Sequence, residues 1–208
     1  RTNQARRVFA KNAGQICLDK YEITYMSLKH IQEIYKEKTV PLFKRESMSA
    51  SILAVPRIQK VVVNIGTGRV KDSKETEEII KNLKLITGQV PEGRPARVSI
   101  ASFKSRKGSI IGYRVTLRGK RMYDFLERLV FVAIPRMRDF RGLAKSAVDE
   151  HGNLHIGIRE HIIFPEMIGE DIRKIFSFQV SVVTNAKTKE RAELLFRSLG
   201  FPLAKQNK

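Results

Sequence analysis

The side chains best suited to metal chemistry gather between residues 149 and 161. Three histidines, His151, His155 and His161, lie close to Glu160 in this stretch. Imidazole and carboxylate groups bind zinc, but the spacing here matches no zincin motif and no cysteine lies nearby. We therefore interpret the histidines as surface or packing residues, and we predict neither a metal site nor a cofactor.

Asp149 and Glu150 raise an alternative from another class of protein, a metal-dependent nuclease assisted by the histidines. A two-metal site needs several carboxylates that converge on one point, and the sequence supplies no such group. No serine stands in the Gly-x-Ser-x-Gly pattern of a nucleophile elbow. These carboxylates fit ordinary surface charge, and we predict that the chain is not an enzyme.

Two glycines, Gly66 and Gly68, follow a strand-like run, as glycines do in dinucleotide-binding loops. The third glycine of that fingerprint is replaced by Lys71. We expect a tight turn between a strand and a helix at this place, because glycine tolerates the backbone angles of such turns.

Cationic side chains recur in three segments, PARVSIASFKSRKG from Pro95, LRGKR from Leu117 and PRMRDFRGL from Pro135. Across the chain 40 Lys and Arg oppose 21 Asp and Glu, which gives a formal charge of +19 and a pI near 10.3. One such run is commonly a solvated face, but three together favour contacts with phosphates. The sequence thus predicts a nucleic-acid-binding protein.

Membrane and secreted classes fit the chain poorly. No stretch approaches the roughly 18 apolar residues of a spanning helix, and the first twenty residues lack the pattern of a secretory signal. Cys17 is the only cysteine, so it cannot form an internal disulfide, which fits a reducing compartment. The 208 residues, of which 42% are apolar, can bury one core. We predict a cytosolic protein with no membrane partner.

Strand-like and helix-like patterns alternate along the chain and predict an α+β fold with a single domain. The predicted helices and strands are helices over Ser27 to about Lys44, Asp72 or Ser73 to Gly88, Lys120–Val132 and Lys189–Leu199, and strands over Ile58–Ile65, Arg97–Phe103, Ile111–Leu117 and Phe178–Val183. Pro41 is expected to kink or end the first helix.

A β-hairpin is expected where the two middle strands meet, with residues 104–109 at its tip. Gly108 supplies backbone freedom at the turn. Lys104, Arg106 and Lys107 place three positive charges on this projecting loop. The hairpin makes part of the sheet antiparallel.

Several ordered segments resemble one family. They include VPRIQKVVVNIGTG from Val55, IPRMRDFRGL from Ile134 and GNLHIGIREHIIFPE from Gly152. From about Leu28 to Phe201 the chain is similar to the large-subunit ribosomal protein five family. The resemblance implies a twisted, mostly antiparallel sheet with helices packed on one face, and binding to 5S rRNA in the central protuberance of the ribosome.

The resemblance also implies residues that contact RNA. A polar trio on the sheet of that family matches Asn64, Gln89 and Thr116 in this chain. Short amides and hydroxyls can bond to sugar 2′-hydroxyls and base edges. Asn64 is unusual in its own right, because it interrupts an apolar strand. Arg118 follows Thr116 by strand alternation and is expected to hold a phosphate beside it.

Further partners follow from the same resemblance. The hairpin tip of Lys104, Arg106, Lys107 and Gly108 resembles the family loop that reaches the tRNA in the peptidyl site. The segment that carries Arg136, Arg138 and Arg141 resembles a family segment near large-subunit rRNA and the small-subunit head protein, and the division of contacts between those two partners stays open. A free-standing regulatory RNA-binding protein is a third reading.

Residues 1–25 depart from the family pattern, so we divide the chain into an N-terminal extension at 1–25 and an RNA-binding domain at 26–208. The stretch RRVFAKNAGQI from Arg6 faintly resembles the tail of ribosomal protein twenty-four of the same subunit. A translational fusion or an upstream-extended reading frame is our hypothesis for it. A basic disordered arm is the alternative.

Overall fold

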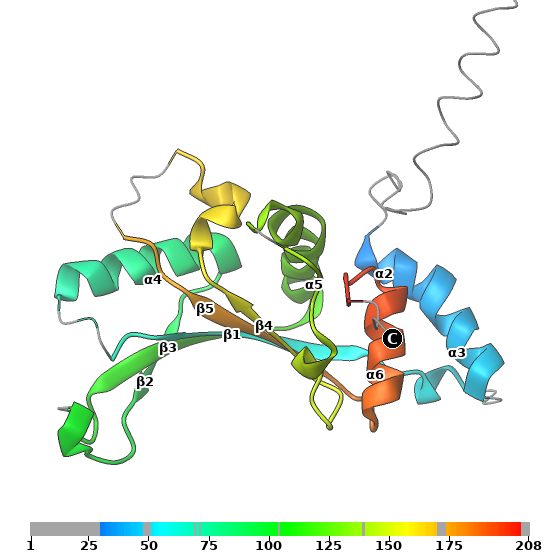
Figure 1. Ribbon diagram of the computed structural model, residues 1–208, viewed down its shortest axis with the longest axis horizontal. Helices are drawn as coiled ribbons and strands as arrows, with labels where there is room; N and C mark the ends of the chain where they lie inside the picture. The colour runs from blue at the N-terminus through cyan, green and yellow to red at the C-terminus, as the bar shows by residue number, and fades with distance from the viewer. Residues whose placement is uncertain are drawn as a thin grey trace, which may run out of the picture.

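The computed structural model describes residues 30–47, 51–68, 70, 72–103, 105–138, 140–169 and 174–204. The predicted extension at 1–25 lies outside these residues, as do Lys71 and Lys104. The described part of the chain is built around one sheet (Figure 1).

The sheet has five strands in the order β2-β3-β1-β5-β4, and every neighbouring pair is antiparallel. The strands are β1 (Ile58–Gly66), β2 (Glu92–Pro95), β3 (Ile110–Leu117), β4 (Leu154–Ile158) and β5 (Phe178–Thr184). This arrangement confirms the predicted α+β class and its antiparallel sheet.

Alternation along the strands gives the sheet one apolar face and one polar face. Val61, Val63 and Ile65 of β1 are almost completely buried, whereas Asn64 between them is exposed. β5 repeats the pattern with buried Val180 and Val182. The apolar face of the sheet is therefore one wall of the core.

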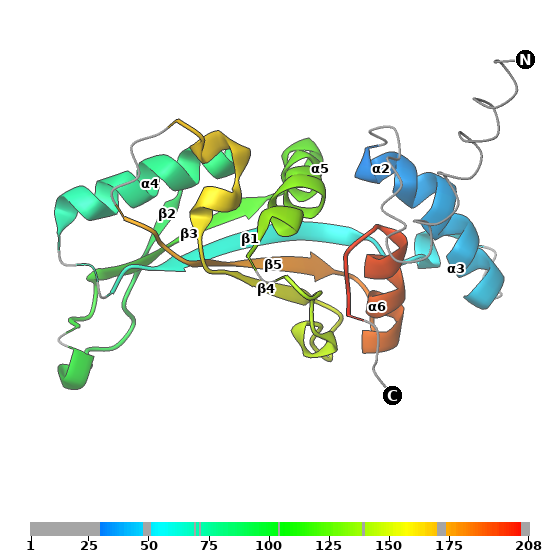
Figure 2. The same ribbon diagram turned by 45° about the horizontal axis from the view of Figure 1, so that its top comes forward.

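Helices cover that apolar face, as expected. α4 (Ser73–Thr87) and α5 (Gly119–Glu127) lie above the sheet in Figure 1 and on the same side in Figure 2. Leu83, Ile86 and Phe125 are fully buried beneath them. α4 ends at Gly88, whose φ of 68° is left-handed and whose N–H bonds to the Lys84 carbonyl, which confirms the predicted helix end.

A second group of helices packs at one end of the sheet. α2 (Ile31–Ile34), a π-helical turn (Tyr35–Thr39) and α3 (Val40–Ser47) form one continuous helix beside α6 (Lys189–Ser198), and the Thr39 hydroxyl bonds to the Ser198 hydroxyl at 2.8 Å. Pro41 was predicted to kink or end the helix; it lies inside this helix, so it does not end it. The wider π turn, in which the Val40 N–H bonds to the Tyr35 carbonyl, accommodates a residue that has no N–H to donate.

The predicted strand Arg97–Phe103 was also wrong. The partner of β3 is β2, which ends at Pro95, and the chain then forms a loop that closes where the Ala96 N–H bonds to the Ser109 carbonyl at 2.8 Å. Val98 and Phe103 favour strands by residue type, but they are 67% and 76% exposed. Without packing neighbours, β-propensity does not make a strand.

β4 was missed. Leu154, Ile156 and Ile158 are buried and alternate with polar positions, which is the pattern of a half-buried strand. The pattern is only five residues long, which is short for a period to be recognised, and it includes His155, which we interpreted as a surface or packing residue. It supplies one edge of the sheet.

Candidate nucleic-acid interface

The polar face of the sheet has no helix over it among the described residues (Figures 1 and 2). We call this surface the open face. It consists of residues of neighbouring strands that pair directly with one another in the sheet. Asn64 pairs with Arg114 of β3 and Gln179 of β5. In the next row, Val62 pairs with Thr116 and Ser181. Directly paired residues of an antiparallel sheet project to the same side, so these groups form one surface.

Two of the four predicted 5S rRNA contacts are brought together on this face. Asn64 and Thr116 lie on neighbouring strands, one step of two residues apart in register. Arg118 follows the end of β3, is exposed, and keeps an extended backbone before α5 begins. Gln89 lies apart, in the turn between α4 and β2, where its N–H and carbonyl contact the Thr87 hydroxyl.

Arg114 is a further cation on the open face that the sequence could have predicted. It precedes Thr116 by two residues on the same strand, so strand alternation places both on one face. Its guanidinium lies 3.9 Å from the Glu92 carboxylate, which also binds Arg94 at 2.9 Å. One carboxylate therefore forms ion pairs with two arginines at this edge of the sheet, so the positive charge there is only partly neutralised.

Gln179 could not have been found in the sequence, because its place depends on the long-range pairing of β1 with β5. Together with Asn64 it lines an open hollow of about 400 Å³. Gly66, Gly157 and Arg159 also line the hollow, and a Cβ added at either glycine would have no atom within 4 Å. The glycines thus leave bare backbone between two amides and a guanidinium.

A hydrogen-bond network supports the Gln179 side of this hollow. His155 Nε2 lies 3.4 Å from the Asp149 carboxylate, and His155 Nδ1 lies 2.9 Å from the Ser181 hydroxyl and 3.3 Å from the Gln179 amide nitrogen. Burial alone would raise the pKa of Asp149, but hydrogen bonds from the Asn153 side chain and N–H and from His155 lower that pKa below its ordinary value. Asp149 is therefore a firmly ionised acceptor.

This network also explains the carboxylate and histidines that raised the nuclease alternative. Asp149 is occupied by Asn153 and His155, and His161 is completely buried and stacked on Phe176. Among the described residues no three His, Cys, Asp or Glu side chains come together as metal ligands would. Nor does any described helix have the length and apolar character needed to cross a bilayer.

The hairpin tip lies at one end of the open face and projects to the uncovered side of the sheet (Figure 1). Arg106 and Lys107 are exposed, and Gly108 has a φ of 89°, as the predicted turn requires. The exposed Phe103 lies in a short 3-10 turn (Ala101–Phe103) of the same loop. Cationic and apolar groups thus share one protrusion.

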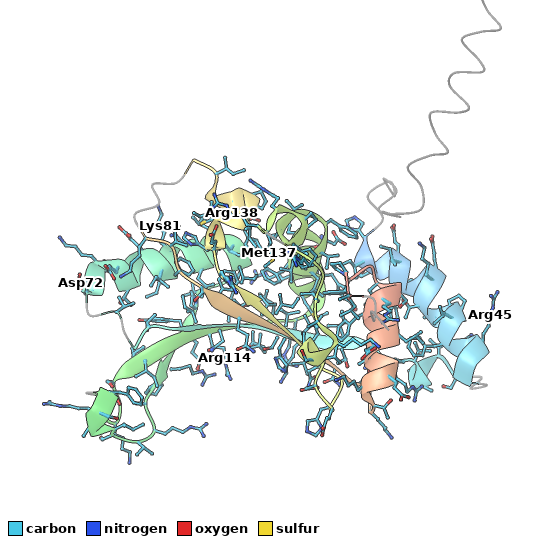
Figure 3. All side chains as sticks on the ribbon, viewed as in Figure 1. Arg45, Asp72, Lys81, Arg114, Met137 and Arg138 are labelled. Atoms are coloured by element: carbon cyan, nitrogen blue, oxygen red, sulfur yellow. The ribbon has the colours of Figure 1, made fainter. Side chains whose placement is uncertain are left out.

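The arginines of the third cationic segment lie elsewhere. Arg136, Arg138 and Arg141 are all exposed. Arg136 is the last residue of the 3-10 turn (Ile134–Arg136) that continues the helix begun by α5, and the other two follow it. Figure 3 places Arg138 on the helix-covered side of the sheet and Arg114 on the open face. Arg138 and Arg114 therefore face different surroundings.

Comparisons with known proteins agree with this geometry. Residues 51–106 match a family model described as ribosomal protein L5, and residues 110–203 match a second model, which describes the C-terminus of the same ribosomal family. The large ribosomal subunit protein uL5 of Chlorobium phaeobacteroides is 44% identical over 91% of this chain and 97% of its own length. The uL5 proteins of Syntrophomonas wolfei and Chloroflexus aurantiacus are each 46% identical, over 84% and 83% of this chain and 99% and 96% of their own lengths.

These similarities extend over almost the whole length of the relatives, and they account for the basic charge and the uncovered polar sheet. The expected location on the ribosome and the expected lack of enzymatic activity follow from them. The chain belongs to the ribosomal protein L5 family and is a structural, RNA-binding constituent of the large ribosomal subunit.

Proposed function

We propose that the chain binds 5S rRNA through the open face of its sheet. The observation that carries this proposal is the exposed Asn64, a neutral amide between the buried Val63 and Ile65 of the central strand, with Thr116 and Arg114 on the strand beside it. A polar residue at the centre of a sheet has no role in the core, so it is available to a ligand.

The chemistry of this face suits folded RNA. The amide of Asn64 and the hydroxyl of Thr116 can each donate and accept hydrogen bonds, which matches ribose 2′-hydroxyls and base edges. Arg114 and Arg118 supply charge for phosphates beside them. Gln89 lies apart from these residues, in the turn between α4 and β2, and we propose that it contacts a neighbouring part of the RNA.

Filter binding of the full chain to 5S rRNA tests the proposal. We expect tighter binding to 5S rRNA than to an unrelated RNA of equal length, and Asn64→Ala and Thr116→Ala should each weaken it by roughly fivefold to tenfold, since each removes a hydrogen bond. Asn82→Ala on α4 is the matched control, because this partly exposed amide lies in the helix layer. Equal affinity for the two RNAs would refute the proposal.

We further propose that the hairpin tip contacts the tRNA in the peptidyl site. Arg106 and Lys107 are exposed on the protrusion and can reach phosphates outside the 5S rRNA surface. The double variant Arg106→Ala, Lys107→Ala should weaken tRNA binding to ribosomes and leave the affinity of the free protein for 5S rRNA within about twofold. A parallel loss of both would assign the tip to 5S rRNA instead.

For Arg136, Arg138 and Arg141 we propose contacts with large-subunit rRNA or the small-subunit head protein, because all three are exposed and Arg138 lies on the helix-covered side of the sheet. Reassociation of purified subunits distinguishes these partners. Loss of reassociation with intact subunits in the Arg138→Ala variant would favour the head protein, whereas loss of incorporation into the large subunit would favour rRNA.

A further inference from the structure

The hollow beside Asn64 has the features of a nucleotide subsite. The backbone of Gly66 and Gly157 lines it, and a Cβ added at either glycine would meet no atom within 4 Å, which leaves room for a flat ring there. Its walls carry the amides of Asn64 and Gln179, and the exposed guanidinium of Arg159 stands at the same opening. A volume of about 400 Å³ is enough for one nucleotide.

The orientation of the Gln179 amide determines what this site selects. His155 Nε2 lies 3.4 Å from the ionised Asp149 carboxylate, and with the imidazole proton on Nε2 the ring's lone pair lies on Nδ1. Nδ1 lies 2.9 Å from the Ser181 hydroxyl and 3.3 Å from the amide nitrogen of Gln179, which directs its N–H toward that lone pair. The Gln179 carbonyl oxygen remains, and it has no partner among the described residues.

We infer that this hollow holds one unpaired nucleotide of the bound RNA and that Gln179 selects a base with an exocyclic amino group. The free carbonyl oxygen accepts from that amino group, and Asn64, opposite Gln179 in register, bonds to the neighbouring base edge. Arg159 pairs with the phosphate. His155 and Asp149 are positioning residues, since they hold the amide with its oxygen toward the base.

This inference rests on the proposed function, because it needs RNA on the open face. Binding of 5S rRNA in which single unpaired nucleotides carry analogues tests it: purine riboside lacks the amino group of adenosine, zebularine lacks that of cytidine, inosine lacks that of guanosine, and 2′-deoxynucleotides lack the ribose hydroxyl. For the wild-type chain we expect one position at which loss of the amino group weakens binding by roughly fivefold to tenfold.

The variant Gln179→Met has a side chain of similar length without the carbonyl. It should bind the RNAs with and without the amino group at that position about equally. Gln59→Met is the matched control, since Gln59 is an exposed glutamine of β1 that does not line the hollow. It should keep the full discrimination. Discrimination that survives in Gln179→Met, or a sensitive position that responds only to 2′-deoxy substitution, overturns the inference.

The positioning role has a separate readout. His155→Phe keeps a ring on β4 but cannot accept from Gln179, so the ratio of affinities for the amino and amino-free RNAs should fall. If His155 were only structural, both affinities would fall equally and the ratio would stay. If the wild-type chain prefers 5S rRNA and Asn64→Ala weakens that binding, but Gln179→Met does not change the discrimination, only this inference is refuted. If the wild-type chain does not prefer 5S rRNA, the proposed function is refuted as well.

Discussion

At the scale of single residues, Gly112 is a point of close approach between β3 and β1. It pairs with Gly66, and a Cβ added to Gly112 would lie 2.6 Å from the Ile65 carbonyl oxygen. The carbonyl oxygen belongs to the backbone and the position of a Cβ is fixed by its own backbone, so no side-chain rotation can relieve the overlap. Gly112 is therefore a steric requirement of the central strand pair, whereas a Cβ at Gly66 would meet no atom within 4 Å.

We predict that Gly112→Ala lowers the free energy of unfolding by about 2–3 kcal/mol, because the strands must move apart. Urea denaturation followed by circular dichroism measures it. Gly157→Ala is the control, since a Cβ there meets no atom within 4 Å, and it should change stability by less than about 0.5 kcal/mol. Equal stability of Gly112→Ala and the wild-type protein would contradict the prediction.

His161 gives the protein a defined pH dependence of stability. It is completely buried, its ring stacks on Phe176 at 4.0 Å, and burial lowers its pKa below the ordinary 6.5. The unfolded chain therefore takes up a proton more readily than the folded chain does. The stability associated with neutral His161 is complete above pH 6.5 and is lost as the pH falls below 6.5 toward the lower pKa of the folded state.

We predict that the free energy of unfolding decreases below pH 6.5 with a contribution from His161 of at most about 1.4 kcal/mol per pH unit, the limit for one proton. Urea titrations at several pH values measure this slope. In His161→Phe, which keeps a ring against Phe176 but cannot be protonated, the slope should be shallower. An unchanged slope would show that another group is responsible.

At the scale of elements, the helix that begins with α2 is held by a residue of another helix. Glu127 of α5 accepts the Ile31 N–H at 2.8 Å and lies 3.1 Å from His30 Nδ1. The carboxylate thus caps the first turn of α2, where no side chain of α2 itself provides a cap. The buried Ile34 and Phe43 then anchor the same helix in the core.

Glu127→Ala should destabilise the protein by about 1–2 kcal/mol, because it leaves a helix N-terminus uncapped. Glu127→Gln retains an acceptor oxygen and should recover part of the loss. Glu77→Ala, at an exposed position of α4, is the matched control. Thermal unfolding monitored at 222 nm, roughly the helix band, reports all three. A loss in Glu127→Ala no larger than that in Glu77→Ala would exclude the capping role.

Periodicity in the sequence was enough to predict most elements. The apolar stripe of α4, the β-branched run of β1 and the alternation of β5 each determine one structure locally, because each has enough residues to set a period. The Arg97–Phe103 segment carries strand-forming residues but no buried neighbours, so its type could not be inferred from propensity. Pro41 was misjudged because a π turn depends on the packing around it.

Some residues of the site could likewise be predicted from the sequence, and others could not. Asn64 and Thr116, which lie on different strands, could be placed on one face from the family resemblance. His155 and Gln179 could not, because their meeting depends on the register of β4 against β5 and of β5 against β1, and no local pattern specifies a register between distant strands. Arg114 was within reach of strand alternation and was overlooked.

At the scale of the whole molecule, a net charge of +19 makes binding to any RNA favourable at low salt. Specific binding must therefore be separated from this general attraction by its salt dependence. Arg114 and Thr116 lie on the same strand and offer a matched pair of a charged and a neutral contact.

We predict that Arg114→Ala makes the slope of log affinity against log salt concentration shallower by roughly one unit, because one phosphate contact is lost. Thr116→Ala should weaken binding to 5S rRNA but leave the slope unchanged, since a hydroxyl releases no counterion. Filter binding over a series of KCl concentrations measures both. Equal slopes for the two variants would exclude Arg114 from phosphate contact.

The two family segments at 51–106 and 110–203 are not separate bodies in this molecule. The first contributes β1 and β2, the second contributes β3, β4 and β5, and the strands of the two segments interleave in one sheet. The boundary between the segments falls in the loop of the hairpin. Neither half can complete the core without the other.

The place of β1 in the middle of the sheet has a consequence for biosynthesis. One of its two partners, β5, is among the last parts of the chain to be made. During translation the nascent polypeptide can form the hairpin of β2 and β3 and add β1 to it, but the far edge of β1 stays unpaired until Thr184 has emerged. That exposed edge is a template for wrong pairing between chains. A chain truncated before Phe178 therefore keeps this edge of β1 unpaired, and we expect it to aggregate rather than to act as a shortened RNA-binding protein.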